Sequence, residues 1–279
     1  MKAKHLFPFS VAISLLLLAP QGSRAGVLLD DSWASSSYRE QSLPRHSAWF
    51  SSGTRPGVAT NALTFYLHDT SFMAITYFTE DPEQPVEIAP GKELTATFWL
   101  SLNDVAPANP SFGFRLGLFN FAGSSLVPKR VSGKKFSSAS QGQGVQGYAL
   151  FQNMSAALGT TPLNIRKRTA IEDGLLLGKT EDWTSLARPT NSLPKFAGFT
   201  NDVVYTLTVS LQRMAPGSML VGVTWSNTIT GAQLAASATD TNATNFAFDG
   251  IALRAMSDQT TARSITLKRA RVELAPATR

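Results

Sequence analysis

A period of two in the apolar residues is the feature that most constrains this sequence. Residues 111–119 alternate throughout, with Phe112, Phe114 and Leu116 on one face and Arg115 on the other. Since successive side chains of a strand point to opposite faces, this pattern predicts a strand with one apolar face. Further runs rich in β-branched and aromatic residues also predict strands; they lie at residues 93–102, 203–212, 218–227, 250–255 and 264–273.

Short turn signals separate these predicted strands. Gly and Pro mark turns at residues 89–92 and 215–218, and a third turn ends at Gly231. Many strands at short spacing favour an antiparallel sandwich or barrel. The composition, 43% hydrophobic and 16% charged, excludes a wholly disordered chain. Neither an internal repeat nor a linker divides the sequence, so residues 26–279 are expected to form a single domain.

Residues 1–25 are typical of a secretory signal peptide. Lys2 and Lys4 precede an apolar run that ends at Pro20, and Ser23-Arg24-Ala25 is a small-x-small cleavage site. Cleavage lowers the 25 basic residues to 22 against 19 acidic ones, so the formal net charge falls from +6 to +3. We therefore expect a secreted or periplasmic protein without a nucleic-acid partner and without a membrane after signal cleavage. The alternative is an uncleaved membrane anchor.

The scarcity of strong metal ligands limits the chemistry. The chain has no cysteine and three histidines, which excludes disulfides, thiolate metal sites, cysteine nucleophiles and a histidine-rich metal centre. Asp240-Thr241-Asn242 offers oxygen ligands but lacks the full pattern of a calcium-binding loop. No cofactor is expected and no metal ligand is assigned, while a structural calcium ion stays an open alternative.

Several segments resemble the concanavalin A-like lectin/glucanase superfamily, as found in secreted bacterial proteins. The resemblance rests on residues 29–33 (LDDSW), 41–44 (QSLP), 47–52 (SAWFSS), 114–119 (FRLGLF), 147–149 (GYA) and 265–272 (ITLKRARV). It implies an all-β fold, an antiparallel two-sheet β-sandwich of jelly-roll type, with a glycan on the concave face. The carboxylate signature of the superfamily's hydrolases is absent, which argues against double displacement by two carboxyl groups.

Polar residues on the predicted strands are candidate substrate-binding groups. Arg115 lies opposite an apolar face, Asn164 alternates with two arginines, and Tyr148 shares a face with Gln152. If these strands are neighbours, their polar side chains form a basic groove suited to an acidic polysaccharide, since guanidinium groups bind carboxylates in a bidentate manner. The alternative is ordinary cross-strand pairing on a solvated face. The candidate substrate-binding residues are Arg166, Arg168, Gln152, Asn164 and Trp183.

The same groove suggests a polysaccharide lyase. Arg115 would neutralise a uronate carboxylate, while Tyr148, Tyr77 or His68 would remove the proton α to it. His68 is followed by Asp69, yet neighbouring strand residues point to opposite faces, so a loop histidine is the simpler interpretation. Catalytic roles are therefore assigned to Tyr148, Arg115 and His68 under this hypothesis alone.

Tryptophans are candidate platforms for sugar rings. Trp99 and Trp225 lie in strand patterns and are expected in the core, whereas Trp183 follows two acidic residues and is expected to be exposed. Three functions remain: a secreted protein that binds an extracellular polysaccharide, acidic in one alternative, on its concave face; a lyase cleaving an acidic polysaccharide by β-elimination; and a non-catalytic structural surface or matrix protein. The residues leave open whether the protein is an enzyme.

Overall fold

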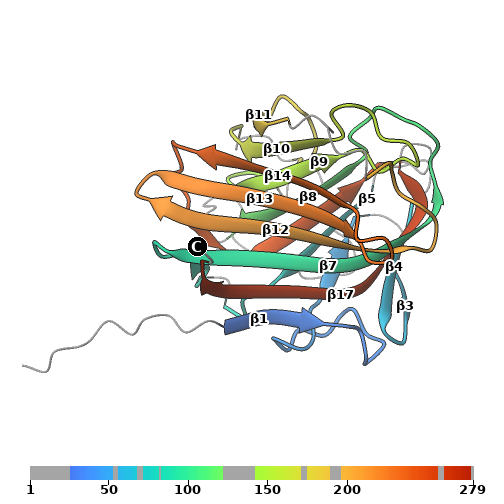
Figure 1. Cartoon of the computed structure of the whole chain (residues 1–279). Helices are drawn as coiled ribbons and strands as arrows, with labels where there is room; N and C mark the ends of the chain where they lie inside the picture. Colours follow the sequence, from blue (N-terminus) through green and yellow to red (C-terminus); the bar gives the residue numbers. More distant parts are fainter. Residues whose placement is uncertain are drawn as a thin grey trace, which may run out of the picture.

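Two antiparallel sheets packed face to face form the protein (Figure 1). The computed structural model describes residues 26–52, 56–67, 72–81, 83–121, 142–170, 175–188, 196–256 and 261–277. These ranges contain strands and no helix, so none of them forms a helix that is long and apolar enough to cross a membrane. The expected signal peptide and His68 lie outside the described residues.

The first sheet has eight strands and is nearer the viewer in Figure 1. Its order is β14 (Gln233–Asp240), β13 (Ser218–Asn227), β12 (Val204–Ala215), β7 (Lys92–Val105), β17 (Ala262–Pro276), β4 (Ala62–Tyr66) and β3 (Gly57–Ala59), with β1 (Gly26–Asp31) also paired to β17.

The second sheet has seven strands and lies behind the first. Its order is β11 (Trp183–Ala187), β10 (Leu163–Arg168), β9 (Gln146–Gln152), β8 (Phe114–Asn120), β16 (Gly250–Ala255), β5 (Phe72–Tyr77) and β2 (Trp49–Ser51). A short ribbon of β15 (Ala247–Phe248) and β6 (Val86–Glu87) lies outside both sheets. The predicted antiparallel sandwich of jelly-roll type is confirmed.

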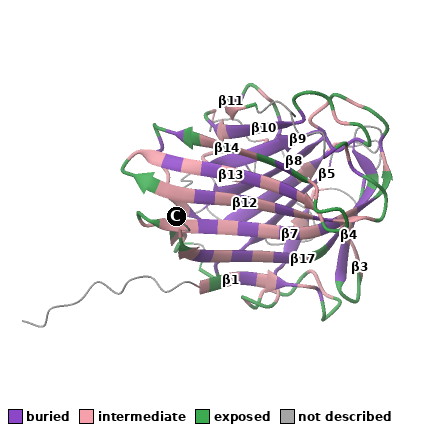
Figure 2. Cartoon of the chain, viewed as in Figure 1, coloured by how far each residue is buried: buried purple, intermediate pink, exposed green. Residues whose placement is uncertain are grey.

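The main core lies between the two sheets, because each contributes its apolar alternate positions. Phe98, Leu207 and Trp225 come from the eight-stranded sheet, and Leu116 and Leu150 come from the seven-stranded sheet. In Figure 2 buried and partly buried residues alternate along β7, β12 and β13. Burial of this apolar surface, at about 25 cal/mol per Å², supplies the driving force that a chain without disulfides requires.

The two sheets differ on their outer faces. Strands β5, β8, β9 and β16 of the seven-stranded sheet are buried at nearly every position, not at alternate ones. The reason is a second apolar cluster on the outer face of this sheet. It includes Ile75, Phe119 and Phe151, and also Leu177 and Trp183 from the chain that follows β10. Residues 175–182, which precede β11, therefore act as an additional layer over the sheet.

Candidate functional site

The predicted arginines lie together on the outer face of the seven-stranded sheet. Arg115 on β8 is the direct cross-strand partner of Arg254 on β16. Phe151 of β9 lies between two cations, with guanidinium carbons of Arg115 and Arg166 at 4.3 and 4.9 Å from the centroid of its ring. The alternation that placed these arginines opposite the apolar positions is thereby confirmed, and the strands are neighbours as the groove hypothesis required.

These guanidinium groups are engaged by backbone, not open to solvent. Arg115 donates to the carbonyls of Leu177, at 2.9 Å, and Gly178, and Arg254 donates to Leu177 at 2.8 Å. Arg166 donates to the carbonyl of Thr180 at 3.0 Å. Arg115 and Arg166 are only 8% and 7% exposed. The arginines thus hold residues 175–183 against the sheet, and this segment covers the face where a glycan was expected.

The pKa shifts of Arg115 and Arg166 agree with the burial of these side chains. Desolvation, followed by repulsion from Arg254 and Arg166, lowers the pKa of Arg115 to about 10. Desolvation also lowers the pKa of Arg166. Both groups remain cationic at neutral pH. Charge-assisted hydrogen bonds and the ring of Phe151 offset the free-energy cost of burying these two charges.

Other predicted residues are buried in ways that sequence reasoning did not foresee. Trp183 is 4% exposed and packs on Phe119 and Phe151, so the expectation that it is exposed is wrong. Arg168 lies 5.9 Å from the Trp183 ring and is 3% exposed. Asn164 is fully buried and accepts a hydrogen bond from the Ser185 hydroxyl at 2.8 Å.

Tyr148 and Gln152 face the interior between the sheets, opposite to the arginines. The expectation that they share a groove with Arg115 and Arg166 is therefore wrong, whereas the roles assigned to them stay predictions. The Gln152 side chain is fully buried, with Nε2 donating to the carbonyl of Asn153.

Tyr148 instead belongs to a polar network at the end of the sandwich. Its hydroxyl donates to Oδ2 of Asp240 at 2.7 Å, and Lys167 Nζ lies 2.8 Å from the same oxygen. The backbone N–H of Asn242 donates to Oδ1 of Asp240 at 3.0 Å. Lys167 also donates to the carbonyl of Asn242 at 2.7 Å. One carboxylate therefore fixes an aromatic ring, an ammonium group and a loop.

Burial and the hydrogen bond to Asp240 raise the pKa of Tyr148 well above its ordinary value. Burial by itself would raise the pKa of Asp240, but hydrogen bonds from Lys167, Tyr148 and Asn242 hold it below its ordinary value. Tyr148 is thus kept protonated, which is the reverse of what a general base requires.

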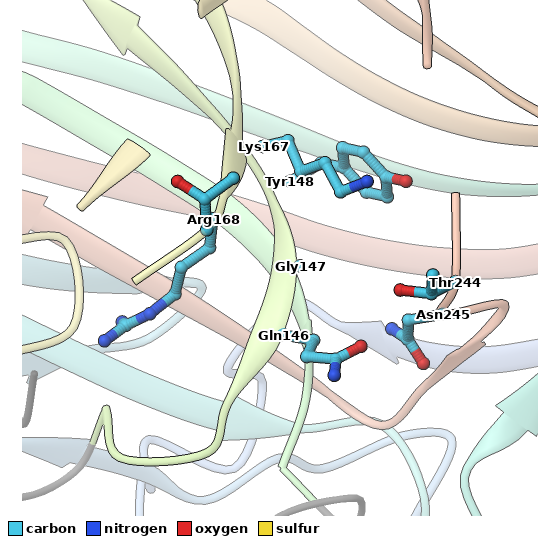
Figure 3. Close-up of a pocket in the computed structure, with 8 residues that line it drawn as sticks. Gln146, Gly147, Tyr148, Lys167, Arg168, Thr244 and Asn245 are labelled. Carbon is cyan, nitrogen blue, oxygen red and sulfur yellow. The ribbon is translucent and has the colours of Figure 1, made fainter. Parts of the chain in front are cut away.

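Beside this network lies a pocket of about 220 Å³ (Figure 3). Figure 3 shows the Lys167 side chain beside the Tyr148 ring, Gln146 directed toward Asn245, and Arg168 directed away from them. The Asn245 Oδ1 accepts from Asn120 at 2.9 Å, while its Nδ2 is buried and has no hydrogen-bond partner. The pocket is lined by Gln146, Gly147, Tyr148, Lys167, Arg168, Thr169, Thr244 and Asn245.

Only part of this polar network could be predicted from the sequence. Lys167 stands between Arg166 and Arg168, so its alternation indicates the opposite face, where it pairs with Tyr148. The approach of Asp240 and Asn245 depends on how β14 and the following loop cross the end of the other sheet, which no local pattern encodes. Among the described residues, no group of three His, Cys, Asp or Glu side chains is arranged to hold a metal ion.

No family model matches the sequence, and no curated protein matches it. Similar solved structures include the carbohydrate recognition domain of Emp47p, with 10% identity, a TM-score of 0.47, and coverage of 93% of this chain and 100% of that one. The CBM2 module of the evolved Dit of Lactobacillus casei BL23 phage J-1 has 10% identity, a TM-score of 0.46, and coverage of 92% and 98%.

A third similar structure is the exoplasmic/lumenal domain of VIP36 in its Ca2+/Man3GlcNAc-bound form. It has 13% identity and a TM-score of 0.44, and the alignment covers 83% of this chain and 84% of that one. Legume-type and L-type lectin domains, which share the concanavalin A-like jelly-roll fold, are thus among the structural neighbours. Because all these TM-scores are below 0.5, we base function on this chain's own residues.

Proposed function

We propose that the protein binds a carbohydrate without cleaving it, and that one sugar unit enters the pocket beside Tyr148. The observation that carries the proposal is the polar lining of this pocket, which brings hydroxyls, amides and the ammonium group of Lys167 around one cavity. A sugar hydroxyl both donates and accepts hydrogen bonds, so it can pair with each of these kinds of group.

The size and rigidity of the pocket suit a small polar ligand. Its volume of about 220 Å³ is below the roughly 300–1,000 Å³ of pockets for drug-sized molecules, so it fits a single sugar unit at a chain end or branch. Asp240 holds the side chains of Tyr148 and Lys167 in place through a hydrogen bond and an ion pair. These side chains therefore lose less conformational entropy when a ligand binds.

The natural ligand in this proposal is an extracellular polysaccharide, met after export to the periplasm or the medium. The ammonium group of Lys167 at the pocket admits an acidic sugar, although Asp240 neutralises this charge in part. The alternative of a lyase with Tyr148 as base receives no support from the raised pKa of that hydroxyl. The covered arginine face likewise gives no support to glycan binding by Arg115.

Affinity electrophoresis of residues 26–279 through gels containing neutral or acidic polysaccharides tests the proposal. We expect retardation by at least one polymer. In at least one of the gels that retard the wild type, we expect about thirtyfold weaker retardation of the double variant Gln146→Ala/Thr244→Ala, which loses two hydrogen-bonding side chains at about 1 kcal/mol each. The matched control is Lys268→Met, an exposed position on the other sheet.

Two outcomes would contradict the proposal. One is equal retardation of the double variant and the wild type in every gel that retards the wild type. The other is release of unsaturated uronate from an acidic polymer, followed by its ultraviolet absorbance, which would establish a lyase instead.

A further inference from the structure

The outer face of the eight-stranded sheet is unusually poor in charge across β12, β13 and β14. Two cross-strand rows show this: Thr97, Thr208, Thr224 and Ala235 in one, and Thr95, Ser210, Gly222 and Ser237 in the next. Exposed strand faces normally carry charged residues, which also discourage unwanted pairing at sheet edges. Here every residue of the two rows is threonine, serine, alanine or glycine.

A shallow hollow of about 490 Å³ lies on these rows. Gly222 forms part of its lining, and a Cβ atom there would lie 2.7 Å from the Ser210 hydroxyl oxygen. Any larger residue would therefore disturb the surface at this point. Thr208, Ser210 and Ser237 place hydroxyl groups along the hollow.

Two aromatic rings stand on the same outer face, on strands next to these rows. Trp99 on β7 is partly exposed, although its strand pattern had suggested the core; that expectation is wrong, whereas Trp225 is fully buried as expected. Tyr66 on β4 is 46% exposed, and a Cβ on Gly57 would lie 3.0 Å from its ring. The glycine thus lets the tyrosine ring lie over the backbone of β3.

The register gives the separation of the two rings. Tyr66 pairs with Ser264, which pairs with Asn103, four residues beyond Trp99. Two strand spacings across and four residues along put the two Cα atoms roughly 16 Å apart. This is a distance that an extended polymer spans and a single small molecule does not.

The charge of Arg269, beside Trp99, is neutralised within the face. The Arg269 guanidinium lies 5.2 Å from the Trp99 ring centroid and forms a bidentate pair with Asp30 at 2.6 and 2.7 Å. Hence Arg269 supports the indole without leaving an unpaired cation beside it.

We propose that this face is a second carbohydrate-binding surface, which takes an extended, neutral polysaccharide chain with its sugar rings stacked on Trp99 and Tyr66. Aromatic faces stack on the C–H faces of pyranose rings, and the threonine and serine hydroxyls match the hydroxyl groups of the polymer. A protein partner fits less well, because interface cores are enriched in Tyr, Trp, Met and Arg and depleted in Ser and Ala. The inference does not depend on the pocket beside Tyr148.

Depletion from solution by insoluble cellulose, together with affinity electrophoresis in glucomannan, tests this surface, with alginate as the charged comparison. We expect retention on a neutral polymer and about tenfold weaker retention for Tyr66→Thr and for Trp99→Thr, since each removes one stacking ring. Met214→Ala is the matched control, because Met214 is 53% exposed at the far end of β12.

Further variants keep the test decisive. Ser237→Glu places a charge at an exposed position of the hollow without changing either ring, and it is expected to weaken retention if Trp99→Thr fails to fold. The pocket variant Gln146→Ala/Thr244→Ala is expected to be retained normally on the neutral polymer. Retention that is unchanged in both Tyr66→Thr and Ser237→Glu, or a wild type that binds alginate alone, would overturn the inference while leaving the pocket untouched.

Discussion

The two sheets of this sandwich use their outer faces in opposite ways. The seven-stranded sheet carries Arg115, Arg166, Arg168 and Arg254 on its outer face, and residues 175–182 lie over that face. The eight-stranded sheet leaves its outer residues open. On the covered face guanidinium groups bond to backbone carbonyls, and on the open face they pair with carboxylates. The comparison teaches that a basic cluster on a strand face serves packing when a segment of the same chain lies over it.

The largest effect is expected at the tryptophan of the covered face. Trp183→Ala removes a buried ring that packs on Phe119 and Phe151, and it should lower the free energy of unfolding by about 3–5 kcal/mol. Urea denaturation followed by intrinsic fluorescence measures this loss. Trp99→Ala is the control, because its ring is partly exposed; equal losses at the two positions would remove the distinction between the faces.

A smaller effect is expected at Arg115, one of the arginines that hold the covering segment through hydrogen bonds to its backbone. Arg115→Met keeps the apolar stem but leaves the carbonyls of Leu177 and Gly178 with fewer donors, at a cost of about 1.5–3 kcal/mol. Hydrogen exchange of residues 175–183 should increase in this variant, while exchange in β12 and β13 stays unchanged. Uniform change over both sheets would mean that Arg115 stabilises the whole fold and does not specifically hold this segment.

The smallest effect is expected on the open face. Hydrogen bonds from Arg269, with help from its charge and that of Arg271, hold the pKa of Asp30 below its ordinary 3.8. A lowered pKa gives stability that is present above pH 3.8 and is lost as the pH falls through the folded-state pKa.

Because water and salt screen this pair, Asp30→Asn should cost only about 0.2–1 kcal/mol at neutral pH. Thermal unfolding of both proteins from neutral to acidic pH measures the difference, which should shrink as the carboxylate of the wild type is protonated. A difference that persisted undiminished at low pH would show that the contribution of Asp30 is not electrostatic.

Local pattern was sufficient for much of the fold. The alternation around Arg115, and that of Asn164 with Arg166, assigned these side chains correctly to a common face. The alternation could not predict that residues 175–183 return over that face. A covering segment is a long-range feature and has no periodicity in the sequence. For the same reason the exposures of Trp99 and Trp183 were expected the wrong way round.

The candidate pocket was less predictable than the sheets. Tyr148 and Lys167 are cross-strand partners on adjacent strands, and each follows from a simple alternation. Their carboxylate partner comes from β14 of the other sheet, more than seventy residues along the chain. This contact depends on how the two sheets are stacked, which cannot be predicted from a single sequence.

The position of β17 has a consequence for the order of events during synthesis. The last strand of the chain lies between β7 and β4 and also pairs with β1, the first strand. The eight-stranded sheet therefore has a vacant central slot until residues 262–276 have left the ribosome. The eight-stranded sheet can be completed only when β17 pairs with β7, β4 and β1, and contacts between residues so distant in the sequence form slowly.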